Sequence, residues 1–279
     1  MKVVIFAIHF GPKIAWMDIF LKSCQYNPNI NWVIFTDTIY KTTIPNNVKI
    51  EFMRLDMFIE LANNKLGTDI VNMEPYKVCD FRPSFGILFD NYISEYDFWG
   101  HCDLDIIFGD IEACTLDHLP ELDILSSRGG FKKNGRRSVP KMCGGLSLYR
   151  NSDLVNKLFY KSNFNHIFSS KKHFAFDEHG ISNIIRQNIK LRTKWDIYFF
   201  NYPHETVIKR WWFCTDNHPG TVNNDHIWVW VSGKLYFRGR EVGYLHFQDW
   251  KRIESFNRTI PSADHVDKIY ISRFGICLR

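Results

Sequence analysis

Apolar runs and amphipathic stretches alternate through the first third of the chain. Continuous apolar segments at residues 3–8, 32–37 and 48–55 predict strands, because a run without polar alternation is typical of a strand that is covered on both faces. Between the first two segments, residues 16–24 repeat apolar side chains at helical spacing. This β-α-β order predicts a parallel sheet with right-handed crossovers, whose ligands lie beyond the carboxyl ends of its strands.

Later segments continue the same α/β pattern. Pro75 suits the first turn of a helix over residues 74–93, and Pro83 should break or kink that helix. Residues 143–150 return to strand character, and the segment 173–185 contains an apolar helical run that follows Asp177 and Glu178.

Four candidate residues fall where the first two predicted strands end. His9, Phe10 and Gly11 follow the first strand, and Asp37 ends the second. Because parallel strands end at one edge of the sheet, we expect these residues to line a nucleotide pocket.

Asp103 and Asp105 stand two residues apart in the apolar segment 98–111, FWGHCDLDIIFGDI. In a strand this spacing sends both carboxylates to one face and Leu104 to the other. Two poorly solvated carboxylates side by side call for a cation, and Mg²⁺ or Mn²⁺ usually holds substrate phosphates as well. The pair therefore indicates a nucleotide or nucleotide-sugar substrate. In the alternative interpretation, Asp103 begins a turn and Asp105 is a solvated strand end.

Basic residues and glycines supply further candidates. Lys77 and Arg82 can neutralise a diphosphate or hold a sugar hydroxyl, although Lys77 and Asp80 can equally form a surface ion pair. Gly144 and Gly145 permit close approach of the backbone to a ligand.

Acidic and imidazole groups in the second half complete the set. Asp177 and Glu178 precede an apolar helical run, where capping explains one acid better than two. His246 follows a short predicted strand, and its imidazole can complete a metal shell begun by the two aspartates.

Composition narrows the class of protein. With 279 residues, 45% hydrophobic and 16% aromatic, the chain can bury a large core in one α/β domain or a domain with a small appendage. Seven dispersed cysteines without a C-x-x-C favour neither a disulfide scaffold nor a zinc knuckle, and a cytoplasmic location fits best. The first apolar run is too short for a membrane span and lacks a cleavage site.

The formal charge of +5 is modest. It suits peripheral contact with an anionic membrane or a phosphorylated acceptor, whereas no nucleic-acid motif accompanies it. The loop over residues 128–142 is rich in glycine and basic residues, which allows either a solvated loop or a lid over an anionic ligand.

Taken together, several segments make the chain resemble a GT-A glycosyltransferase, in particular small bacterial polysaccharide-type transferases similar to the retaining galactosyltransferase and glycogenin-like group. These segments are FTD at 35–37, CDLDIIFGD at 102–110, CGGLSLYRN at 143–151, FDEHG at 176–180 and YLHFQDWK at 244–251. The resemblance implies a Rossmann-type mixed sheet flanked by helices, with a glycosyltransferase domain over 1–251 and a C-terminal extension over 252–279.

The resemblance also implies roles for individual residues. Asp103, Asp105 and His246 would form a site for Mn²⁺ or Mg²⁺, in which Asp103 contacts the ribose and a metal-bound water. Lys77 and Lys251 would face the diphosphate or the sugar, although HFQDWK lacks the Gly and Pro of the family's late motif.

The same resemblance places residues 9–11 and Asp37 around the nucleobase, with uracil as the expected base. A UDP-sugar donor and a saccharide or lipid-linked acceptor are then the expected partners.

Glycosyl transfer needs stabilisation of the leaving diphosphate and of an oxocarbenium-like centre. Asp177 and Glu178 are the candidates for the second task, or for the general base of an inverting enzyme. The resemblance of the late His-Phe pair to that of the retaining group implies retention.

Two other classes stay open. A metal-dependent phosphohydrolase or nucleotidyltransferase uses similar aspartates, and a non-catalytic carbohydrate-binding protein would use aromatic rings for stacking. The rings in question are Trp211, Trp212, Trp228 and Trp230, although the alternation at 227–231 is also typical of a half-buried strand.

Overall fold

The computed structural model describes residues 1–126, 132–133, 136–137, 142–187, 212–215, 227–254, 256 and 267–278. Of the predicted lid over 128–142, only the short antiparallel pair β7 (Lys132–Lys133) and β8 (Arg136–Arg137) and Met142 fall within these residues. The lid prediction and Trp211 otherwise lie outside them.

A six-stranded mixed sheet forms the centre of the fold, in the order β3-β2-β1-β4-β9-β6. Strands β1 to β4 run parallel, and β9 is antiparallel to both β4 and β6. Its strands are β1 (Val3–His9), β2 (Ile30–Thr36), β3 (Val48–Phe52), β4 (Phe98–Cys102), β6 (Ile124–Ser126) and β9 (Leu146–Arg150). The predicted α/β class is confirmed, and each predicted strand of the first third is present.

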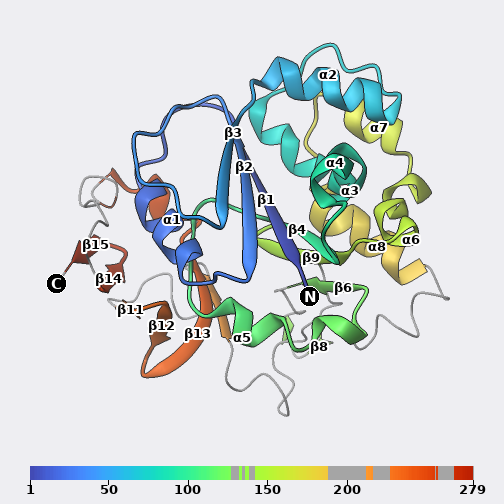
Figure 1. Ribbon diagram of the computed structural model, residues 1–279. Helices are drawn as coiled ribbons and strands as arrows, with labels where there is room; N and C mark the ends of the chain where they lie inside the picture. The colour runs from blue at the N-terminus through green and yellow to red at the C-terminus, as the bar shows by residue number, and fades with distance from the viewer. Residues whose placement is uncertain are drawn as a thin grey trace.

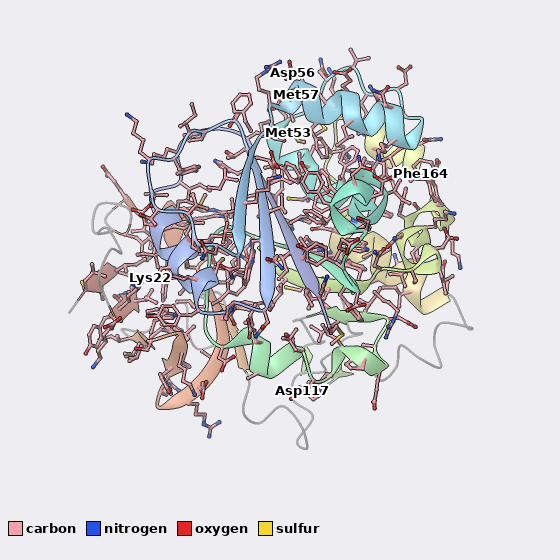
Figure 2. The ribbon with its side chains drawn as sticks, viewed as in Figure 1. Lys22, Met53, Asp56, Met57, Asp117 and Phe164 are labelled. Carbon is pink, nitrogen blue, oxygen red and sulfur yellow. The ribbon has the colours of Figure 1, made fainter. Side chains whose placement is uncertain are left out.

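Successive residues of β1 bury opposite faces of this sheet, as the period of a strand requires. Val4 and Phe6 face a core that includes α2 (Leu55–Leu66), whereas Val3 and Ile5 face one that includes α1 (Met17–Gln25). The helices therefore cover both faces, as Figure 1 shows. In Figure 2, Lys22 of α1 and Phe164 of α7 (Phe164–Ser169) lie on opposite sides of the central strands.

The segment predicted as one broken helix forms three short ones: η1 (Pro75–Ser84), α3 (Phe85–Leu88) and α4 (Asp90–Ile93). Pro75 lies in the first turn of η1, as expected, and Pro83 lies near its end. Because proline lacks an N–H and clashes with the preceding turn, the tighter 3₁₀ form suits this segment.

Short helices make up most of the remaining coverage. They are α5 (Ile111–Thr115), η2 (Leu119–Glu121), α6 (Asp153–Asn156), η3 (Leu158–Lys161), η4 (Phe176–Gly180), α8 (Ile181–Gln187) and η5 (Trp250–Arg252). Among the described residues, no helix is long and apolar enough to cross a membrane.

A second sheet of seven strands packs beside the first. Its strands are β5 (Ile106–Phe108), β10 (Trp212–Thr215), β11 (Trp228–Val231), β12 (Lys234–Phe237), β13 (Arg240–His246), β14 (Lys268–Ser272) and β15 (Gly275–Leu278). Residues of the predicted C-terminal extension supply β14 and β15, and β14 pairs with β11. Trp228 and Trp230 are completely buried in the core of this sheet, so these two rings serve packing.

Candidate functional site

The aspartate pair lies in a turn that joins the two sheets. Strand β4 ends before Asp103 and belongs to the first sheet, whereas β5 begins after Asp105 and pairs with β13 of the second. The prediction that both aspartates lie within one strand is therefore wrong. The backbone N–H of Asp103 donates to Gly145 O (3.0 Å), and that of Phe247 donates to Asp105 O (3.0 Å), so contacts from both sheets fix the turn.

Both carboxylates still face the same imidazole. The Nε2 atom of His246, the last residue of β13, lies 3.5 Å from Asp103 Oδ2 and 3.3 Å from Asp105 Oδ1. One ligand atom from each of the three residues falls within 4.8 Å of the others. Because β13 ends beside this turn, the side chains of Asp103, Asp105 and His246 converge as the sequence pattern predicted.

The donor set fits a divalent cation. His246 Nε2 is buried but has no hydrogen-bond partner, although two carboxylates face it. A metal ion bound by this nitrogen and the carboxylate oxygens would satisfy all three groups. Two carboxylates and one imidazole suit Mn²⁺ or Mg²⁺ with open positions for further oxygen ligands.

The charges in this cluster compensate one another. Burial opposes ionisation of Asp105, but His246 and Lys251 outweigh it and hold the pKa of that carboxyl well below its usual range. Burial likewise opposes protonation of His246, and the Asp105 and Asp103 carboxylates raise its pKa. Lys251 Nζ lies 2.6 Å from Asp105 Oδ2, so a cation already stands at the edge of the predicted metal site.

Arg82 connects the aspartate turn to Asp177 in the acidic segment after α7. Its Nη2 donates to Asp103, while its Nη1 donates to Gly144 O (2.8 Å) and to Asp177 Oδ2 (3.0 Å). Only 12% of the side chain is exposed. The guanidinium therefore stands between the predicted metal ligands and Asp177, with both of its terminal nitrogens bound.

Asp177 and Glu178 face this site rather than capping a helix. They belong to η4, a turn of π-helix that has no side-chain cap. Glu178 Oε1 accepts a hydrogen bond from Gly144 N (3.2 Å). Burial raises the pKa of Asp177 to about 7 although Arg82 opposes the shift, with Glu178 and Asp103 adding to it. The helix-capping interpretation of these acids is therefore wrong.

The two glycines allow side chains of the site to approach the backbone. A Cβ on Gly144 would lie 3.0 Å from Arg82 Nη1 and 3.1 Å from Asp177 Oδ2, and one on Gly145 would lie 3.1 Å from His246 Nδ1. These distances are tighter than ordinary contacts. We expected close approach to a ligand, and the structure shows close approach to the groups that would hold it.

Comparison with known proteins places the chain in a family. A family model described as "Family of unknown function (DUF6625)" matches residues 5–277. The chain belongs to the DUF6625 family. No curated protein matches it significantly.

Solved structures similar to this DUF6625 chain include several glycosyltransferases. The chain is 12% identical to the bifunctional glycosyltransferase WbbM, with a TM-score of 0.45 over 80% of this chain and 41% of WbbM. It is 9% identical to a glycosyltransferase involved in glycosylation of the PBCV-1 major capsid, with a TM-score of 0.42 over 89% of this chain and 94% of that one.

A third similar structure is mouse xyloside xylosyltransferase 1, which is 12% identical, with a TM-score of 0.40 over 90% of this chain and 99% of that one. All three likenesses are distant. We therefore argue the function from the geometry of the DUF6625 site itself.

We predicted that Lys77 faces the diphosphate or the sugar, but in this DUF6625 chain its side chain lies in the protein interior. It is 1% exposed, and its ammonium donates to Asp80 Oδ2 (2.8 Å), Ile167 O (2.6 Å) and Lys172 O (2.6 Å). The predicted ion pair with Asp80 forms, but in the interior rather than on the surface. Since all three donors of the ammonium are engaged, Lys77 holds the segment before Asp177 in place.

The residues at the ends of β1 and β2 come together as predicted. Gly11 N donates to Asp37 Oδ1 (3.0 Å), and His9 Nε2 lies 2.8 Å from Pro12 O. Phe10 is buried and packs against Phe58. Because β1 pairs directly with β4, this group lies at the same edge of the sheet as the aspartate turn.

Sequence reasoning missed His173. One of its ring nitrogens lies within 4.8 Å of carboxylate oxygens of Asp80 and Asp177. The residue sits four positions before Asp177 in an irregular segment, and no spacing pattern distinguishes it from other surface histidines.

Proposed function

We propose that this protein is a metal-dependent glycosyltransferase that moves a sugar from a nucleoside-diphosphate donor to a saccharide acceptor. The observation that carries the proposal is the convergence of the buried Nε2 of His246 with the carboxylates of Asp103 and Asp105. Arg82 and Lys251 beside this cluster supply the cationic groups that a departing diphosphate requires.

Asp103, Asp105 and His246 would hold Mn²⁺ or Mg²⁺, which supplies Lewis-acid stabilisation of the leaving diphosphate when bound. Lys251 now neutralises Asp105 from 2.6 Å. With a dication held by Asp103, Asp105 and His246, the Lys251 ammonium would be available to donate to a phosphate oxygen. Arg82 orients Asp103 and Asp177 through separate nitrogens.

Asp177 is our candidate for the group beside the reacting carbon. It is buried, and Arg82 holds its carboxylate next to the proposed metal site. With a pKa of about 7, this carboxylate can either stabilise positive charge at the sugar or accept the proton of an acceptor hydroxyl. We propose a retaining outcome on the resemblance of the late His-Phe pair, and the anomeric coupling constant of the product tests it.

The donor is proposed to be a UDP-sugar, with Gly11, Asp37 and their neighbours around the base. The acceptor is proposed to be a saccharide or a lipid-linked saccharide, reached at the inner face of the membrane, where a formal charge of +5 favours peripheral contact with anionic lipid. The burial of Trp228 and Trp230 removes two of the rings that would support a non-catalytic carbohydrate-binding protein.

A thermal-shift panel of UDP, GDP, CDP and TDP, each with and without Mn²⁺, tests the proposal. Ligand at about 100 times its dissociation constant adds about 2.7 kcal/mol of stability. We expect a shift for UDP that requires Mn²⁺ and disappears in Asp105→Asn. Asp123→Asn is the matched control, because Asp123 is also a buried aspartate paired with a cationic side chain, that of Arg150, 3.3 Å away.

Retention of the UDP–Mn²⁺ shift in Asp105→Asn would refute the assignment of Asp105 as a metal ligand. Release of inorganic phosphate or pyrophosphate from the donor, in place of a nucleoside diphosphate, would instead favour a phosphohydrolase or nucleotidyltransferase.

A further inference from the structure

One face of η1 leads from solvent into the proposed active site. In a 3₁₀-helix, side chains three residues apart eclipse one another, so Tyr76, Cys79 and Arg82 form a row. Tyr76 is 68% exposed at the outer end, and the Arg82 side chain is 12% exposed at the inner end. Lys77 and Asp80 form the next row and are buried, which fixes the direction in which the first row points.

His173 stands beside the outer end of this row. Its ring centroid lies 4.7 Å from that of Tyr76, with the two planes inclined at 56°. Its imidazole also lies within 4.8 Å of an Asp177 carboxylate oxygen, through a ring nitrogen. His173 therefore borders the carboxylate that we place beside the reacting carbon, and Tyr76 packs against His173 on its outer side.

Electrostatics agree with this placement. Partial burial raises the pKa of Tyr76, and the carboxylates of Asp103 and Asp177 add to the shift. The Cys79 thiol, whose pKa burial raises to about 12, stays neutral between the tyrosine and the arginine. The wall of the site thus changes from charged at Arg82 to uncharged and aromatic at Tyr76.

An exposed tyrosine that meets a second ring beside a group of charged side chains is suited to bind a sugar. One face of a pyranose ring is lined by C–H groups and can pack on an aromatic face, while its hydroxyls bind polar tips such as the tyrosine O–H. A diphosphate, in contrast, requires the cations at the other end of the site.

The order of contacts assigns the sugar to the acceptor. His246 contacts Asp103, Asp103 pairs with Arg82, Arg82 pairs with Asp177, and the two rings follow. A donor diphosphate on the metal end would place the transferred sugar near Arg82 and Asp177. A sugar ring bound beyond Arg82 and Asp177, toward solvent, is then that of the incoming acceptor.

We propose that Tyr76 and His173 form an acceptor subsite that stacks on the C–H face of a pyranose ring, an inference that rests on the proposed function. The subsite would hold the acceptor with one hydroxyl directed toward Asp177. No covalent step involves either ring.

Saturation-transfer NMR with methyl glycosides of glucose, galactose, N-acetylglucosamine and rhamnose, in the presence of UDP and Mn²⁺, tests the subsite. We expect saturation of at least one glycoside, and a three- to tenfold weaker affinity, about the worth of one aromatic contact, in Tyr76→Ala. Tyr76→Trp should retain binding. Phe274→Ala, which removes a 56% exposed ring from the turn between β14 and β15, should leave it unchanged.

Each other outcome is decisive. Equal saturation in Tyr76→Ala and wild type, or no saturation of any glycoside by a protein that responds to UDP and Mn²⁺, would overturn the subsite and leave the donor site standing. Weaker UDP binding in Tyr76→Ala would show that the ring serves the nucleobase, which also overturns it. Tyr76-dependent saturation without any UDP response would support the subsite and refute the transferase function.

Discussion

The buried ion pair between Lys77 and Asp80 gives the sharpest test of how this fold supports its site. Lys77 and Asp80 side chains are 1% and 0% exposed. Asp80 also accepts hydrogen bonds from the backbone of Phe174 (2.9 Å) and Phe176 (2.8 Å), immediately before Asp177. Lys77 and Asp80 together therefore position the segment that carries the acidic residues.

Removing either partner of this pair should lower the free energy of unfolding substantially. Lys77→Met leaves a buried carboxylate without its cation and leaves the carbonyls of Ile167 and Lys172 without their donor. Removing one partner of a buried pair costs about 3–5 kcal/mol. Asp80→Asn leaves a buried ammonium instead, and we expect a loss of the same size.

The double variant separates the pair from its surroundings. With both charges gone, neither single penalty applies in full, so the combined loss should fall short of the sum by about 2 kcal/mol or more. The free energy of unfolding, measured by urea titration with tryptophan fluorescence, gives all four values.

A surface pair of the same kind serves as control. Lys157 pairs with Asp153 four residues away, and their side chains are 52% and 80% exposed. Lys157→Met should change stability by no more than about 0.5 kcal/mol. A loss below about 1 kcal/mol in Lys77→Met, or full additivity in the double variant, would refute the argument that this pair is what orders the segment.

Two further predictions concern the site itself. Gly145→Ala places a Cβ 3.1 Å from His246 Nδ1 and should displace the ring, weakening Mn²⁺ binding about tenfold in a calorimetric titration; an unchanged affinity would contradict the role of this glycine. In the metal-free protein, the raised pKa of Asp177, about 7, means that the folded state keeps a proton that the unfolded state has lost. The contribution of Asp177 to stability should therefore be greatest below about pH 4 and fall by up to about 4 kcal/mol as pH rises from 4 to above 7. Asp177→Asn should remove this part of the slope, and identical pH profiles for the two proteins would rule the shift out.

Much of the central sheet follows from local pattern. β1 and β2 are continuous apolar runs because their two faces meet separate cores, and such runs are recognisable without any partner. Residue chemistry likewise pointed to Asp103, Asp105 and His246, because carboxylates beside an apolar run need a compensating charge wherever they fold.

Other features depend on where distant segments meet. The aspartates lie in a turn because β5 leaves the first sheet to pair with β13, and local alternation contains no trace of that change of sheet. The buried ammonium of Lys77 binds carbonyls about ninety residues further along the chain. Because these partners cannot be recognised from the neighbouring residues, the charge of Lys77 suggested only a surface ion pair or a phosphate ligand.

The α/β class, the strands of the parallel sheet and the types of group at the site thus follow from the sequence, because they depend on local periodicity and side-chain chemistry. Which groups meet depends on tertiary packing. In the tertiary structure, Gly145 lies against His246, and Arg82 lies between Asp103 and Asp177. Tyr76 lies beside His173. Such contacts join residues far apart in the chain, and their geometry follows from how sheets and helices pack rather than from any nearby pattern.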